Sequence, residues 1–178
     1  MKIMFISDIH GIKSNLNKID DKFNELNCDK LVVLGDLYYA NSSIKKEDYY
    51  DANFVKEFLN KYKDKLICVR GNCDSEEEIL TSKFSMEKEI NKISTIDEDI
   101  YITHGHIYNE SNWKETNSIL VYGHLHQPFI KKIETNIYIN PGSISLPRGD
   151  YEATYLIYNN GKFTIYDIND QIIYEKNK

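Results

Sequence analysis

The sequence predicts an α/β fold in which buried strands alternate with amphipathic helices. Five short apolar runs rich in β-branched residues are typical of buried strands. Two stretches between the first three runs carry apolar residues at helical spacing. This alternation implies βαβ units and a sheet covered by helices. From about residue 129 onward, the pattern changes to strands joined by turns.

The elements follow one another in a regular order. The predicted strands span residues 2–7, 30–34, 65–69, 99–103 and 118–122. The first predicted helix begins at the N-cap candidate Ser14, runs to residue 27 and presents apolar residues at positions 16, 19, 23 and 26. A second helix with the same kind of pattern is predicted over 51–62. A hairpin is predicted in the C-terminal part, with its turn at residues 159–161.

Length and composition indicate a single domain over residues 1–178. The chain is 41% apolar and 28% charged, which is ordinary for a globular protein. Its net charge of -6 and its lack of a Lys/Arg stripe argue against polymeric nucleic acid as a partner. It has no apolar run of about 20 residues, no signal-peptide core and only three cysteines, so we expect a cytoplasmic, soluble protein without membrane contact. The oligomeric state is open, a homo-oligomer included.

Polar side chains follow all five predicted strands. The segments at these strand ends read SDIH, GD, RGNCD, HGH and GHLH. They contain all five histidines of the chain: His10, His104, His106, His124 and His126. The carboxyl ends of strands in open α/β sheets form the usual ligand crevice. We therefore expect these five segments to converge on one site.

The strand-end side chains have the chemistry of a metal site. Residues 8 and 10, like residues 124 and 126, are two positions apart, and in an extended segment such pairs point to the same side. Mixed carboxylate and imidazole donors suit Mn, Fe or Zn. Seven donors exceed a tetrahedral zinc site but fit two metals that share a carboxylate. The seven are Asp8, His10, Asp36, Asn72, His104, His124 and His126.

The order of these blocks resembles that of the calcineurin-like metallophosphoesterases. The blocks are Asp8-Ile-His10, Gly35-Asp36, Gly71-Asn72-Cys73-Asp74, His104-Gly105-His106 and Gly123-His124-Leu125-His126. NPGS at 140–143 is similar to a later block of small bacterial members, and RGNCDSE and THGH are similar to the YfcE-like phosphodiesterases. The resemblance implies a two-layer β sandwich flanked by helices, the αββα arrangement.

The resemblance also implies ligand sets and a reaction. The first metal would be held by Asp8, His10, Asp36 and His126. The second would be held by Asp36, Asn72, His104 and His124, with Asp36 as the bridge. Manganese is the favoured ion, with Fe, Zn, Ni or Mg as alternatives. A hydroxide bridging the two metals would attack a small phosphodiester, and the catalytic set would be Asp36, Asn72, His10 and Asp74.

Three residues are assigned to the substrate side: Cys73, His106 and Arg70. Cys73 stands where much of the family has a histidine that protonates the leaving oxygen. A thiol of ordinary pKa is a weak donor, so we expect the substrates to have leaving groups that are stable as anions. Lys45 or Lys46 is a further cation that could reach a substrate.

Several alternatives stay open on the sequence alone. Asp74 and Ser75 could simply cap a helix, because Ser75 and Glu78 have capping-box spacing. His106 could be structural. The polar insert at 37–51 could form a lip beside the site. The activity could be that of a phosphomonoesterase or nucleotide pyrophosphatase, or the chain could be a non-catalytic interaction module, as in a retromer sorting subunit of similar fold.

Overall fold

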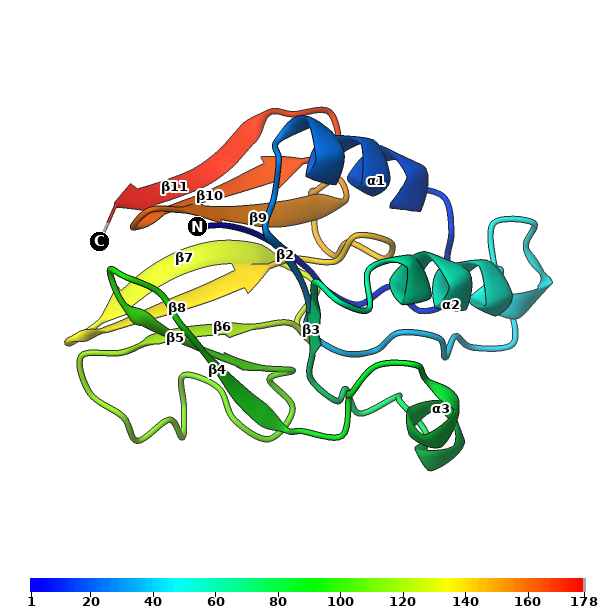
Figure 1. The fold of residues 1–178 in the computed structure, drawn as a ribbon, viewed down its shortest axis with the longest axis horizontal. Coiled ribbons are helices and arrows are strands. Elements are labelled where there is room, and N and C mark those ends of the chain that lie inside the picture. Colours follow the sequence, from blue (N-terminus) through cyan, green and yellow to red (C-terminus); the bar gives the residue numbers. More distant parts are fainter. Residues whose placement is uncertain (178) are drawn as a thin grey trace.

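The protein consists of two β-sheets packed face to face, with helices beside them (Figure 1). The computed structural model describes residues 1–177. Its elements are β1 (Lys2–Ile6), α1 (Leu16–Glu25), β2 (Lys30–Val33), the 3₁₀ helix η1 (Ile44–Lys46), α2 (Ala52–Lys61), β3 (Leu66–Cys68), α3 (Glu76–Thr81), β4 (Ile90–Ser94), β5 (Asp99–Thr103), β6 (Ile119–Tyr122), β7 (Pro128–Ile133), β8 (Asn136–Pro141), β9 (Thr154–Asn159), β10 (Lys162–Asp167) and β11 (Ile172–Asn177). This confirms the predicted α/β class and the two-layer sandwich.

Parallel pairing brings the predicted strand ends to one side of each sheet. The strand order is β11-β10-β9-β1-β2-β3 in one sheet and β4-β5-β6-β8-β7 in the other. Strands β1, β2 and β3 are parallel to one another, and so are β5, β6 and β8. The carboxyl ends of parallel strands lie at the same end of a sheet, so the segments that follow them can meet.

Strand β1 is buried on both faces. Met4 and Ile6 pack in the core shared with α1 and α2, whereas Ile3 and Phe5 pack in the core between the two sheets. Successive strand side chains point to opposite faces, so a strand covered on both sides reads as a continuous apolar run. The KIMFI segment fits this rule. Its apolar run therefore reflects a strand that is buried on both faces and not the apolar face of a helix.

The outer face of the second sheet is covered without a helix. Leu120, Tyr122 and Tyr138 form a small apolar cluster there, and Trp113, from the segment between β5 and β6, packs against it. The helices α1 and α2 lie on the side of the other sheet (Figure 1). None of the helices within residues 1–177 is long and apolar enough to cross a membrane.

Most predicted boundaries lie within one residue of the observed ones, and two differences from the predictions are larger. Helix α1 starts at Leu16, two residues after the predicted start, and Asn15 holds the N-cap position without a side-chain hydrogen bond. Strand β4 was not predicted, because only Ile93 of its five residues is buried and the apolar signal is weak. The predicted hairpin is confirmed. Its turn residues Asn160 and Gly161 have φ of 46° and 83°, as a two-residue type I′ turn requires.

Candidate metal centre

The loops that follow the strands hold their ligand candidates in an unusual backbone conformation. Positive φ values occur at Asp8 (55°), His10 (52°), Asp36 (55°), His124 (65°) and His126 (61°). Non-glycine residues rarely adopt this conformation, and where the surroundings impose it the residue is often functional. The extended geometry predicted for the 8/10 and 124/126 pairs is therefore wrong. Both members of each pair nevertheless reach the same site.

Three histidines are oriented by backbone carbonyl groups. In each ring, Nδ1 is within hydrogen-bond distance of a carbonyl oxygen, which accepts only if Nδ1 carries the proton. When such a ring is neutral, its Nε2 atom has a free lone pair, and all three Nε2 atoms lie beside the carboxylates of the cluster, the arrangement found in metal-bound histidines. The distances are 2.6 Å from His10 to Tyr39, 2.6 Å from His104 to Leu34 and 2.7 Å from His126 to Leu146.

The carboxylates lie among these Nε2 atoms. Asp36 Oδ2 is 3.6 Å from Nε2 of His10 and 3.4 Å from Nε2 of His104. Asp8 Oδ1 is 3.3 Å from Nε2 of His126. A single oxygen of Asp36 therefore lies beside one histidine of each ligand set implied by the resemblance. This is the position that a bridging carboxylate would need.

The electrostatics of the cluster favour charged forms at Asp36 and His104. Burial alone would raise the pKa of Asp36, but His104, the Cys73 backbone N–H and His10 hold it well below its usual range. Burial likewise lowers the pKa of His104, yet its hydrogen bond with Asp36 and the charges of Asp8 and Asp36 raise it to about 9. In the absence of a cation, a proton on His104 thus balances the carboxylates.

Buried atoms without partners indicate that the cluster suits a cation. Among the described residues, Asp8 Oδ1 and His10 Nε2 are buried and have no hydrogen-bond partner. Such an atom costs about 1–3 kcal/mol unless something satisfies it. Three overlapping groups have ligand atoms within 4.8 Å of one another: Asp8, His10 and His126; His10, Asp36 and Cys73; Asp8, Asp36 and His104. Carboxylate and imidazole donors at this density fit divalent metal ions.

The two remaining candidate ligands lie at the edge of this cluster. Asn72 Oδ1 is 3.0 Å from Nε2 of His104. The ring of His124 packs edge-on against the ring of His104, with centroids 5.1 Å apart, and its backbone N–H donates to Asp8 Oδ2 at 3.1 Å. Five of the seven predicted ligands thus form the close cluster, and Asn72 and His124 lie beside it.

Asp74 fixes the loop that carries Asp36. Its buried carboxylate accepts hydrogen bonds from the backbone N–H groups of Asp36 (3.0 Å), Leu37 (2.7 Å) and Gly71 (2.8 Å). The capping box of α3 is made instead by Ser75 with Glu78. Asp74 is therefore not a helix cap. Gly71 is required beside it, because a Cβ there would lie 2.2 Å from the Asp36 nitrogen.

The NPGS segment ties two further loops together. Asn140 Nδ2 donates to the carbonyl oxygen of Gly123 at 2.6 Å, and Ser143 Oγ donates to that of Asp8 at 2.8 Å. These bonds join the end of β8 to the loops after β1 and β6. The sequence alone did not indicate the role of this segment. In the structure it positions the loops that carry candidate ligands and supplies no candidate ligand itself.

The predicted substrate-side residues lie in different places. The Cys73 side chain borders the ligand cluster, and burial together with the charge of Asp36 raises the pKa of its thiol to about 12. The ordinary thiol pKa that we expected is therefore wrong. The ring of His106 lies 5.3 Å from that of His104, and its Nε2 is 3.8 Å from Glu89. Arg70 points to the Asp74 carbonyl oxygen, with Nη2 at 3.5 Å.

A cavity of about 250 Å³ lies over the cluster. It is lined by His10, Asp36, Tyr39, Ala40, Asn41, Ile44, Asn72, Cys73, His124, His126, Leu146 and Arg148. The polar insert at 37–51 thus contributes one wall of this cavity. Sequence reasoning missed Arg148, whose only signal was its position a few residues after NPGS. Arg70, which was predicted to contact substrate, does not line this cavity.

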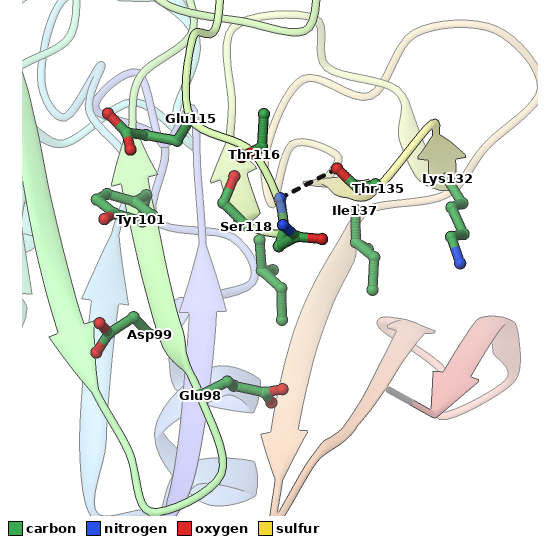
Figure 2. A pocket seen from close by; sticks show the side chains of 11 residues that line it. Glu98, Asp99, Tyr101, Glu115, Thr116, Ser118, Lys132, Thr135 and Ile137 are labelled. Atoms are coloured by element: carbon green, nitrogen blue, oxygen red, sulfur yellow. Dashed lines mark hydrogen bonds between the residues drawn. The ribbon is translucent and has the colours of Figure 1, made fainter.

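A larger cavity, of about 480 Å³, lies elsewhere. Figure 2 shows its lining, which includes Glu98, Tyr101, Glu115 and Lys132. It lies at the amino ends of β6 and β8, opposite the strand ends that carry the candidate ligands. None of the predicted site residues lines it. The larger of these two cavities is therefore not the one that lies over the candidate ligands.

Comparisons with known proteins agree with this geometry. The profile of the calcineurin-like phosphoesterase superfamily domain matches residues 1–161. The phosphodiesterase YfcE of Escherichia coli strain K12 is 35% identical over 176 residues, which cover 97% of this chain and 95% of YfcE.

Solved structures give the same result. The structure of the E. coli phosphoesterase Yfce superposes with a TM-score of 0.93 at 31% identity, covering 99% of both chains. Vacuolar protein sorting 29 from Cryptosporidium parvum superposes with a TM-score of 0.63 at 17% identity, covering 99% of this chain and 98% of that one. At that identity, the second match reflects the fold alone.

Proposed function

The chain belongs to the calcineurin-like phosphoesterase superfamily, and on this premise we propose that it is a metal-dependent phosphodiesterase acting on small substrates through two divalent ions. The observation that carries the proposal is the cluster of buried carboxylates and imidazoles, with two unpartnered atoms, beneath a small cavity. When bound, the ions would activate a water molecule and neutralise charge on the phosphoryl group. The similarity to E. coli YfcE supports this activity.

Each ligand residue has a defined task in this proposal. The first ion would be held by Asp8, His10, Asp36 and His126. The second would be held by Asp36, Asn72, His104 and His124. The Nδ1–carbonyl contacts keep the three buried rings aimed at the ions, and Asp74 keeps the Asp36 loop in place. Manganese fits this mixed donor set, with Fe, Zn, Ni or Mg as alternatives.

The cavity supports a small substrate. About 250 Å³ is slightly below the roughly 300–1,000 Å³ of common small-molecule pockets. The net charge of -6 gives no electrostatic attraction for a long polyanion. A Cys73 thiol with a raised pKa stays protonated at neutral pH but is a weak donor. Substrates whose leaving group is stable as an anion are therefore favoured.

A metal-dependence assay tests the proposal. Protein stripped with a chelator should be inactive and should recover hydrolysis of bis-p-nitrophenyl phosphate when Mn²⁺ is added. Asp36→Asn should lose activity by at least about 10³-fold, since one residue would serve both ions. Asp21→Asn, an exposed aspartate on α1, is the control for the charge change. Faster turnover of p-nitrophenyl phosphate or of single-stranded DNA would contradict the proposed substrate class.

A further inference from the structure

The cavity over the ligand cluster is lined by an arginine that is free to bind an anion. The side chain of Arg148 is exposed, and Arg148 is the one Arg or Lys residue that lines this cavity within the described residues 1–177. Over the same residues, no carboxylate forms an ion pair with it. A solvated arginine is common on protein surfaces. Two further observations distinguish this one.

The backbone that carries Arg148 is fixed to the metal ligands. Its N–H donates to the carbonyl oxygen of His126 at 3.0 Å, and the Leu146 carbonyl oxygen is 2.7 Å from Nδ1 of the same histidine. The N–H of Leu146 donates to Ser143 Oγ at 2.8 Å, and that hydroxyl donates to the carbonyl oxygen of Asp8. The backbone of Arg148 is thus held beside the ligand cluster, and its side chain lines the cavity there.

The walls around Arg148 are suited to the organic part of a substrate. Tyr39, Ala40 and Ile44 line one side of the cavity, and Leu146 also lines it. The Tyr39 side chain is exposed, and Lys45 Nζ lies 4.8 Å above its ring. The mouth of the cavity therefore combines apolar surface with positive charge, although the protein as a whole has a net charge of -6.

We propose that Arg148 is a specificity-determining residue that binds a negatively charged group on the ester arm of the substrate. The inference rests on the proposed phosphodiesterase function and names its substrate class: phosphodiesters with one arm bearing a carboxylate or a second phosphate. A guanidinium presents its N–H groups as a planar fork that matches either anion in a bidentate manner. The scissile phosphoryl group itself lies over the metal ligands, and the arm extends from it toward Arg148.

The test compares two diesters that release the same leaving group. The substrates are p-nitrophenyl carboxymethyl phosphate, with an anionic arm, and p-nitrophenyl ethyl phosphate, with a neutral arm of similar size. With Mn²⁺ bound, Arg148→Gln should raise KM for the carboxymethyl diester by about 10-fold and leave kcat unchanged, because a charged hydrogen bond is lost. KM for the ethyl diester should change by less than about twofold. Arg148→Lys should lie between the parent and Arg148→Gln.

Lys132→Gln is the matched control. It removes one positive charge at the distant cavity shown in Figure 2 and should affect neither substrate. Equal effects of Arg148→Gln on both diesters, or no effect on either, would overturn the inference while the proposed function stands.

A binding measurement separates the inference from the proposed function. Titration calorimetry should show that 2-phosphoglycolate binds the Mn²⁺-loaded parent about 10-fold more tightly than ethyl phosphate does, and that Arg148→Gln removes the difference. If the parent hydrolyses neither diester, the proposed function fails, and this comparison still decides the role of Arg148. Equal affinities in the parent would refute that role.

Discussion

Replacing Asp74 should damage both stability and activity, although it is not a metal ligand. Asp74 is 3% exposed, and its carboxylate accepts hydrogen bonds from three backbone N–H groups, those of Asp36, Leu37 and Gly71. Asp74→Ala leaves these buried donors without an acceptor, at about 1–2 kcal/mol each, so the free energy of unfolding should fall by roughly 3–6 kcal/mol. Domains of this kind have about 5–15 kcal/mol in total, so the variant should fold but be marginal.

The activity loss should follow from the loop and not from unfolding. At a temperature where the variant remains folded, freeing the Asp36 loop should cost about 10–100-fold in kcat/KM, the usual effect of losing a residue that orients a metal ligand. Urea unfolding of the metal-free protein gives the stability, with Asp21→Ala as the exposed control. Asp74→Asn keeps one oxygen and should lose less stability than Asp74→Ala. A stability loss below about 1 kcal/mol for Asp74→Ala would show that the three backbone hydrogen bonds do not stabilise the Asp36 loop.

Three further predictions concern chemistry, pH and packing. Cys73→Ala should change kcat/KM on activated aryl diesters by less than about tenfold, and Cys73→His should raise kcat/KM most for diesters with alkyl leaving groups. Both effects are measured with a series of diesters of graded leaving-group pKa. A loss of activity in Cys73→Ala as complete as that in Asp36→Asn would contradict this prediction. Because its carboxylate neighbours raise the pKa of His104 to about 9, Mn²⁺ must displace a proton. The Mn²⁺ affinity of the metal-free protein, measured by calorimetry, should therefore rise from about pH 6 to about pH 9; an affinity independent of pH would argue against His104 as a ligand. Gly71→Ala should abolish tight Mn²⁺ binding by displacing Asp36, and unchanged binding would refute the close approach.

Much of the fold could be predicted from the sequence because its strands are buried on both faces. Segments such as KIMFI and ILVY are continuous apolar runs, and this signal does not depend on neighbours. Strand β4 could not be found in this way, since it is an edge strand with one buried side chain. The pairing of two sheets came from the family resemblance, because apolar runs do not say which strands are neighbours.

The candidate ligands could be predicted for a different reason. A parallel sheet collects its strand ends, so polar residues after apolar runs meet in space. The residues that position the ligands were harder to identify. The sequence allows Asp74 to cap a helix or to orient its neighbours, and only its hydrogen bonds with three backbone N–H groups distinguish the two roles. Arg148 belongs to no strand end, and its proximity depends on hydrogen bonds of its backbone with His126 and of Ser143 with Asp8.

Anomalous diffraction from crystals soaked in Mn²⁺ tests the proposal that Asp36 joins two metal sites. We expect two Mn²⁺ peaks about 3.5–4 Å apart on either side of the Asp36 carboxylate, one beside His10 and the other beside His104. In Asp36→Asn crystals, both peaks should weaken together. A single peak in the parent protein, or a second peak that Asp36 does not contact, would show that Asp36 does not bridge two metal ions.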